Sequence, residues 1–150
     1  MNTKEPSRLQ IKVKAKQLFN AQLNLKGEKL QEKIDQFTEL TTNNGLGSPY
    51  GGKNKDQNTD IQLGSKMIWS ISISKEKGDE DYAVLLDSIV NSNSGFFNKI
   101  TKENGNFVGE VTTNRDFIDK GEEYIINFHI QKGDETSVVL PIDPRLKIKP

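Results

Sequence analysis

Alternation of apolar and polar residues is the feature that most constrains the fold of this chain. In the segment 123–130, EYIINFHI, every second residue from Tyr124 to Ile130 is large and apolar. Because successive side chains of a β-strand point to opposite faces of a sheet, this spacing predicts a strand with one apolar face. The same spacing recurs at 9–14, a basic segment, and at 67–74. These segments predict a protein that is built mainly from β-strands.

Four further short segments, with Gly, Asn or Asp close to their ends, are expected to be strands: 82–90, 106–112, 137–140 and 146–148. Short strands with such joints are typical of antiparallel sandwiches and barrels. With 150 residues, the chain has the length of one domain. We therefore expect a single domain, 1–150, that is an antiparallel β-sandwich.

The Asp-Pro pair near the end of the sequence predicts the place of the last strand. Pro144 has no N–H to donate to a neighbouring strand, and proline is mostly confined to the edges of sheets. The last strand is therefore expected at a sheet edge or after a bend. The basic strand at 9–14 is expected to turn its charged face to water. Strand edges at both ends of the sequence are candidate contacts for assembly.

One helix is expected, at about residues 28–41. In this segment the apolar residues follow one another at intervals of four, three and three, at Leu30, Ile34, Phe37 and Leu40. This spacing places them on one face of an α-helix. Residues 17–25 are ambiguous, because Leu23 and Leu25 alternate while Leu18 and Phe19 are adjacent, so no element is assigned there.

A polar segment, 41–60, follows the expected helix and is rich in Asn, Gly, Ser, Lys and Asp. A loop of about twenty residues is unusual in a compact domain and is commonly functional. Asp56, Asn58 and Asp60 place three oxygen-bearing side chains at alternate positions, which is how a calcium loop begins. Tyr50 is a candidate for an exposed aromatic contact with a sugar. These four residues are the predicted ligand site.

The calcium hypothesis can be tested further within the sequence. An EF-hand loop needs Gly at its sixth position and a bidentate Glu at its twelfth. Counted from Asp56, these positions hold Ile61 and Met67. A regular calcium loop is therefore excluded and no metal site is predicted. A looser oxygen site, or a solvated loop of turn-forming residues, remains.

Composition narrows the possible chemistry. The chain has no cysteine, which excludes disulfides, thiolate nucleophiles and cysteine metal sites. His129 is the only histidine, and the alternation of its strand places it opposite Phe128, as a surface imidazole. Asp79, Glu80 and Asp81 are expected at a turn, in solvent, rather than as a catalytic pair. No catalytic residue and no cofactor is predicted.

Charge and hydropathy bear on the partners. Lys and Arg together number 21, as do Asp and Glu, so the net charge is zero and nothing predicts binding to nucleic acid. The sequence shows no apolar run long enough for a signal peptide or a membrane span. We expect a cytoplasmic protein, with export by another route left open. Trp69 alternates with Met67 and Ile71 and is expected in the core.

Four segments in the later part of the chain occur in a recognisable order. TDIQLGSKMIWSISI places a Gly turn before a Trp-bearing strand, DYAVLLDSI follows, and EEYIINFHI precedes a final LPIDPRLKI. In this order, residues 60–150 resemble the bacterial inclusion-body family of the PixA/AidA type. The resemblance implies a β-sandwich protein that accumulates or self-associates in the bacterial cytosol, and it transfers no catalytic residue.

Three functions remain open. The leading hypothesis is a non-catalytic bacterial protein that binds another protein or assembles with itself through the loop 41–60 and strand edges. The alternative is a carbohydrate- or calcium-binding module that uses Tyr50, Asp56, Asn58 and Asp60. The third is a hydrolase that works with carboxylate residues. No feature of the sequence separates the first two.

Overall fold

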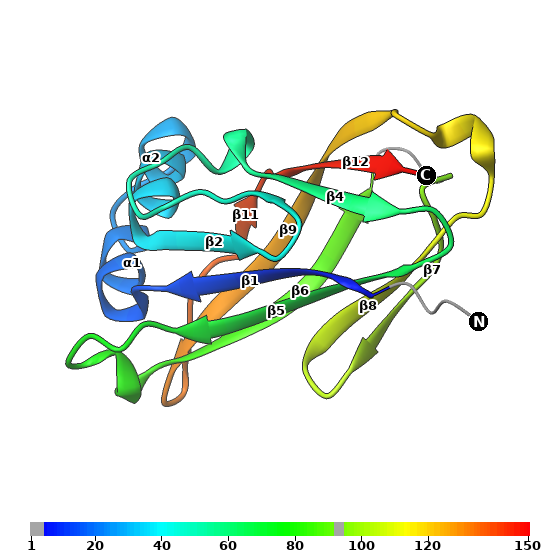
Figure 1. Cartoon of the computed structure of the whole chain (residues 1–150). Coiled ribbons are helices and arrows are strands. Elements are labelled where there is room, and N and C mark those ends of the chain that lie inside the picture. The colour runs from blue at the N-terminus through cyan, green and yellow to red at the C-terminus, as the bar shows by residue number, and fades with distance from the viewer. Residues whose placement is uncertain (1–4, 92–94) are drawn as a thin grey trace.

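The computed structural model of the chain describes residues 5–91 and 95–150. These residues form mainly β-strands, arranged in two sheets, with two α-helices at one end of the molecule (Figure 1). The expectation of a mainly β fold is confirmed. Both sheets are mixed rather than wholly antiparallel, because each contains one parallel pair of strands.

The first sheet has five strands, in the order β2 (Thr38–Thr42), β1 (Ser7–Val13), β5 (Lys66–Ile73), β8 (Asn106–Val111) and β7 (Phe97–Glu103). Its parallel pair is β1 with β5. The hairpin of β7 and β8 turns at Asn104 and Gly105, whose φ angles are 52° and 85°. Positive φ at both central residues defines the turn that best matches the twist of a two-residue hairpin.

The second sheet follows the order β10 (Glu135–Thr136), β9 (Gly121–Lys132), β12 (Arg145–Lys149), β4 (Asn58–Gln62) and β3 (Gly45–Leu46). Two more strands pair with β9: β11 (Leu140–Ile142) and β6 (Ala83–Asn91). The long β9 therefore has β6 along one side, while β12, β11 and β10 follow one another along the other. Short 3-10 turns lie at Asn54–Asp56 (η1), Asp79–Asp81 (η2) and Arg115–Phe117 (η3).

The two helices are α1 (Ala15–Gln22) and α2 (Gly27–Phe37). The helix expected at 28–41 thus ends earlier, and its last residues belong to β2. Leu40 continues the helical spacing, but it is buried as a residue of β2. Its backbone N–H and C=O both bond to Ser48, each at 2.8 Å. The pairing of Leu40 with Ser48 decides the boundary, because a tertiary contact can override local helical spacing.

The helix α1 forms where the sequence predicts no structure. Its N-terminus is stabilised from a distance, since the backbone N–H of Lys16 donates to the Asp79 carboxylate at 2.9 Å. The hydroxyl of Ser74 also donates to this carboxylate, and Asp79 is buried. The expectation that this acid lies in solvent is therefore wrong, whereas Glu80 and Asp81 are exposed. A carboxylate at the first turn of a helix stabilises it through the unpaired N–H groups there.

One apolar core lies between the sheets, with Trp69 fully buried as expected. The indole Nε1 donates to the hydroxyl of Tyr124 at 2.9 Å, so the polar atoms of both side chains are satisfied inside the core. The ring of Phe97 lies 5.4 Å from the indole. A methyl group on Gly109 would come within 2.7 Å of Phe97, so glycine leaves the space that these rings fill.

The strands at the two ends of the sequence are interior strands. β1 lies between β2 and β5, and β12 lies between β9 and β4. The expectation of an edge at either end is wrong. Pro144 is accommodated between β11 and β12, where its carbonyl accepts a hydrogen bond from the Tyr124 N–H at 3.1 Å. None of the helices in the described ranges is long and apolar enough to cross a membrane.

Candidate functional site

The structure places two of the four predicted ligand residues on one strand and the other two outside it. Asn58 and Asp60 lie together on β4, where the Asn58 amide donates to the Asp60 carboxylate at 3.0 Å. Asp56 is exposed in η1. Tyr50 lines a cavity on another part of the surface, with none of the other three residues in its lining. The described residues include no group of three or more histidines or acids that could hold a metal ion.

The polar segment 41–60 is largely built into the sandwich. The backbone C=O of Asp60 accepts from the Ser7 hydroxyl at 2.7 Å and from the Asn44 amide at 2.8 Å. The hydroxyl of Thr59 lies 3.1 Å from that of Thr42, which joins the two sheets directly. These groups bond to the protein itself, so the segment is neither a structureless loop nor a fully solvated one.

A buried amide holds the same segment against α2. Asn54 is fully buried and its amide donates to the hydroxyl of Thr38 at 3.0 Å, while its backbone N–H donates to the Asp35 carboxylate at 3.3 Å. Burial raises the pKa of Asp35 above its ordinary value. Burial also raises the pKa of Asp143, and the negative charge of Asp35 adds to that effect.

His129 is less exposed than a free surface imidazole would be. Its Nδ1 lies 2.7 Å from the Asp87 carboxylate, and its Nε2 lies 3.3 Å from the amide of Gln131. The ring is thus fixed on the outer face of β9, between residues of β6 and β9. This arrangement orients the imidazole without bringing a hydroxyl nucleophile to it among its described hydrogen bonds.

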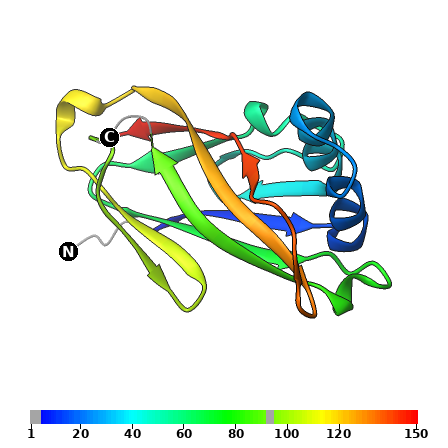
Figure 2. The ribbon, with the colours of Figure 1, turned by 180° about the vertical axis from the view of Figure 1, so that it is seen from behind.

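Along its second side, β6 has no strand partner among the described residues (Figure 2). Antiparallel pairing with β9 leaves the N–H and C=O of alternate β6 residues facing away from that partner. One such group, the C=O of Leu86, accepts from the Lys102 ammonium at 3.2 Å. A row of unpaired backbone groups of this kind is able to pair with another chain.

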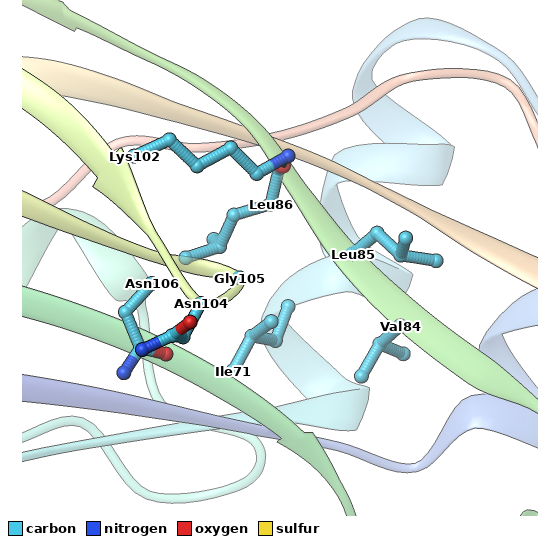
Figure 3. A pocket seen from close by; sticks show the side chains of 8 residues that line it. All are labelled: Ile71, Val84, Leu85, Leu86, Lys102, Asn104, Gly105 and Asn106. Atoms are coloured by element: carbon cyan, nitrogen blue, oxygen red, sulfur yellow. Dashed lines mark hydrogen bonds between the residues drawn. The ribbon is translucent and has the colours of Figure 1, made fainter.

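A cavity of about 210 Å³ opens beside this edge of β6 (Figure 3). One wall is apolar, and its side chains come from β5 and β6: Ile71, Val84, Leu85 and Leu86. The hairpin of β7 and β8 supplies the other wall, with Lys102 and the turn at Asn104 and Gly105. The unpaired backbone and the apolar wall therefore lie together, where β6 faces β5 and the hairpin of β7 and β8.

A β-bulge shapes the same edge. The register of β6 against β9 shifts between Leu86 and Ser88, so Asp87 is the extra residue. A bulge bends a strand and increases its twist, and it commonly protects an edge from uncontrolled pairing. The Asp87 carboxylate is engaged with His129 of β9 at 2.7 Å, so the charge beside the free edge is the Lys102 ammonium. The edge is thus guarded at its middle by charge and by irregular geometry.

A second group of exposed apolar side chains lies near the end of α1. Leu23 is 62% exposed, and Val138 and Val139 are 53% and 58% exposed. The backbone N–H of Val138 donates to the side chain of Gln22 at 3.2 Å, which brings the two segments together. This group is a competing candidate for a contact surface, although its residues do not belong to an unpaired strand edge among the described residues.

Among solved structures, an inclusion body protein, PixA, from Burkholderia cenocepacia J2315 is similar to this chain. The similarity covers 97% of each chain, with a TM-score of 0.63 and 12% sequence identity. The chain has the PixA fold. No protein-family model matches the sequence, and no curated protein matches it.

The PixA fold includes the part of the chain that the sequence resemblance leaves out. The sequence motifs indicate a likeness for residues 60–150, whereas the structural similarity spans 97% of the chain and so includes β1 and the helices. The open edge of β6 was not predicted, because the dense apolar run at 82–90 is typical of a central strand. The charged Asp87 in the middle of this apolar run is a local signal of an edge, because charged residues are common on edge strands.

Proposed function

We propose that this protein is a non-catalytic protein that associates with further copies of itself through the free edge of β6. The observation that carries the proposal is the edge itself: in the part of the chain that the structure describes, the nine-residue strand β6 pairs along one side, and its other side adjoins a cavity with one apolar wall. An extended segment that pairs with such an edge satisfies its backbone groups, and its side chains can fill an adjacent apolar space.

A second copy of β6 suits this edge. Two identical strands that pair in antiparallel fashion about a two-fold axis offer each other the same alternation of N–H and C=O groups. The chain carries 21 basic and 21 acidic residues, so two copies do not repel each other through net charge. The protein of similar fold is described as an inclusion body protein, which supports a role at high local concentration.

Lys102 and the bulge at Asp87 make this association conditional. For a second strand to pair at Leu86, the Lys102 ammonium has to leave the Leu86 carbonyl, which it holds at 3.2 Å. Lys102 is exposed, and a hydrogen bond from an exposed ammonium is worth little against water. The association is therefore reversible and depends on concentration: dilute protein is monomeric, and concentrated protein forms pairs.

The test is light-scattering mass across a hundredfold range of protein concentration, with two matched variants. Val84→Lys places a charge on the cavity wall beside the edge, and Val138→Lys places the same charge in the other exposed apolar group. We expect the mass to rise with concentration for the wild type and for Val138→Lys, but not for Val84→Lys. Circular dichroism checks that both variants fold.

Two results would contradict the proposal. A wild-type mass that stays at that of one chain across the whole range means that the edge does not pair with a second copy. A rise that Val138→Lys abolishes and Val84→Lys preserves assigns the association to the apolar group at α1. Binding to a different protein through β6 would leave the wild type monomeric and so counts against self-association.

A further inference from the structure

The sequence contains two Asn-Gly pairs, Asn44 with Gly45 and Asn104 with Gly105. Because glycine carries no Cβ, its backbone nitrogen is less hindered and its backbone is freer to move than those of other residues. This nitrogen can therefore attack the side-chain carbon of the asparagine before it. Whether it does so depends on how firmly the fold holds each pair. The first pair lies where β2 leads into β3, and the second forms the turn of the β7–β8 hairpin.

Hydrogen bonds hold Asn44 in place. Its side-chain amide donates to the Asp60 carbonyl at 2.8 Å, its own carbonyl accepts from the Asp60 N–H at 2.7 Å, and its N–H donates to the Thr42 hydroxyl at 3.2 Å. Gly45 pairs with Thr59 in the ladder of β3 and β4. The nitrogen of Gly45 reaches the Asn44 side chain only after several of these contacts break, so the fold protects this pair.

Asn104 is held much less firmly. It is exposed, and its side-chain amide has no hydrogen-bond partner among the described residues. The backbone N–H of Gly105 is likewise without a partner in the described ranges, and a methyl group placed on this glycine would meet no atom within 4 Å. A hairpin turn in open space opens more readily than a segment that is packed and hydrogen-bonded. The two pairs therefore differ in how often the glycine nitrogen can reach the side chain.

We propose that Asn104 is a site of spontaneous modification, at which the side-chain amide is converted to a carboxylate. In the first step the Gly105 nitrogen bonds to Cγ of Asn104. The bond between Cγ and the amide nitrogen breaks, and ammonia leaves with the proton of the Gly105 N–H. Water then opens the resulting succinimide ring at one of its carbonyl carbons. One opening gives aspartate, and the other gives isoaspartate, in which the chain continues through Cγ. Water is the only other reactant.

The modification changes the charge of the cavity beside β6 (Figure 3). Among the described residues that line this cavity, Lys102 is the one that carries a charge, and Asn104 and Asn106 contribute neutral amides. A carboxylate at position 104 places an acid in the same lining and adds one negative charge to a chain whose net charge is zero. Isoaspartate also lengthens the backbone of the turn. The site thus gives older copies of the protein a different surface here, and the inference does not rest on self-association through β6.

The experiment follows the folded chain at pH 8 and 37 °C, with samples taken at intervals for digestion by trypsin and mass spectrometry. Trypsin cuts after Lys and Arg, so the two asparagines fall in different peptides, 34–53 and 103–115. Fragment masses show where an NH₂ has been replaced by an OH. We expect this change at least about tenfold faster at Asn104 than at Asn44, because hydrogen bonds that must break before the reaction slow it.

Two controls separate the effect of the fold from that of the local sequence. The same chain unfolded in guanidinium chloride should be modified at Asn44 and Asn104 at similar rates. Asn104→Gly keeps the turn, since a Gly-Gly pair suits it, but has no side-chain amide at this position. We expect an acidic species to accumulate on ion exchange for the folded wild type and not for this variant. Equal rates at the two asparagines in the folded chain overturn the proposal, as does equal accumulation by Asn104→Gly.

Discussion

The two sheets meet along two sides that are built in opposite ways. On one side, which we name the bridged seam, β1 and β2 lie beside β3 and β4, and hydrogen bonds such as that of Ser7 with Asp60 cross between the sheets. On the other, the open seam, β6 faces β5 and the hairpin of β7 and β8 across a cavity with one apolar and one polar wall. At the bridged seam, polar side chains form hydrogen bonds within the protein. At the open seam, backbone groups of β6 have no strand partner among the described residues. Polar sequence composition is therefore a poor guide to where this fold can bind a partner.

The largest effect on stability is expected from the loss of a buried contact beside the bridged seam. Asn54→Ala removes a fully buried amide that bonds to Thr38 and leaves a small void. Lost hydrogen bonding and the void together should lower the free energy of unfolding by about 2–3 kcal/mol. Asn106→Ala, at the half-exposed wall of the open seam, should change it by less than about 0.5 kcal/mol. Urea unfolding measures both, and equal effects would erase the distinction between the seams.

A second variant tests whether the interior behind the open seam is tightly packed. Gly109→Ala places a methyl group within 2.7 Å of the Phe97 ring and 3.1 Å from the Trp69 indole, which itself packs against Phe97. Overpacking of this kind typically costs about 1–3 kcal/mol. Thermal or urea unfolding should show the loss. Unchanged stability would mean that the interior behind β8 is loosely packed as well.

The Lys102 ammonium, which shields the backbone at the open seam, can be removed by a single substitution. Lys102→Met keeps an unbranched side chain, one atom shorter than lysine, and deletes the ammonium that bonds to the Leu86 carbonyl. We expect little change in stability, within about 0.5 kcal/mol, because the ammonium is exposed. The concentration at which light scattering detects pairs should fall several-fold. Weaker association than in the wild type would show that Lys102 promotes contact instead of shielding the edge.

The smallest effect concerns pH at the bridged seam. Because burial raises the folded-state pKa of Asp35 above its unfolded value, the folded protein holds this proton more tightly. The stabilisation is present in full below the unfolded pKa and is lost as the pH rises through the folded pKa. Asp35→Asn should remove this dependence and stabilise the protein at pH 7 by less than about 1 kcal/mol, since the carboxyl is partly exposed.

Unfolding of the Asp35→Asn variant and of the wild type from acid to neutral pH checks this result. The side-chain oxygen of asparagine can still accept the hydrogen bond from the Asn54 N–H, so the contact itself is retained. A variant that is less stable than the wild type at pH 7 would show that the charge of Asp35 supports the segment that it holds.

Local alternation predicts the strands well because it reports directly on which face is buried. The strand expected at 123–130 is found at 121–132, and Trp69 lies in the core as its neighbours indicate. The helix α1 escapes such reasoning, since the carboxylate that caps it belongs to Asp79, 63 residues along the chain from Lys16. Parallel pairs, such as β1 with β5, escape it as well, because alternation does not say which strands become neighbours.

The candidate sites were harder to predict than the fold. The spacing of Asp56, Asn58 and Asp60 suggests ligands, yet Asn58 and Asp60 bond to each other and Tyr50 lies elsewhere. A polar side chain is free to bind a ligand only if no group of the protein bonds to it across the sandwich. A local sequence pattern does not show which groups face each other there. The free edge of β6 depends in the same way on the strand that is missing beside it.

The central position of β12 has a consequence for the order in which the molecule can form during synthesis. Among the described strands, β12 is the one that joins β4 to β9; it begins at Arg145 and pairs in parallel with β4 and antiparallel with β9. Until the ribosome has released this segment, the second sheet is two separate pieces, whereas β1 and β5 of the first sheet can already pair. Closing such distant contacts is slow. The second sheet therefore cannot be completed before β12 has left the ribosome.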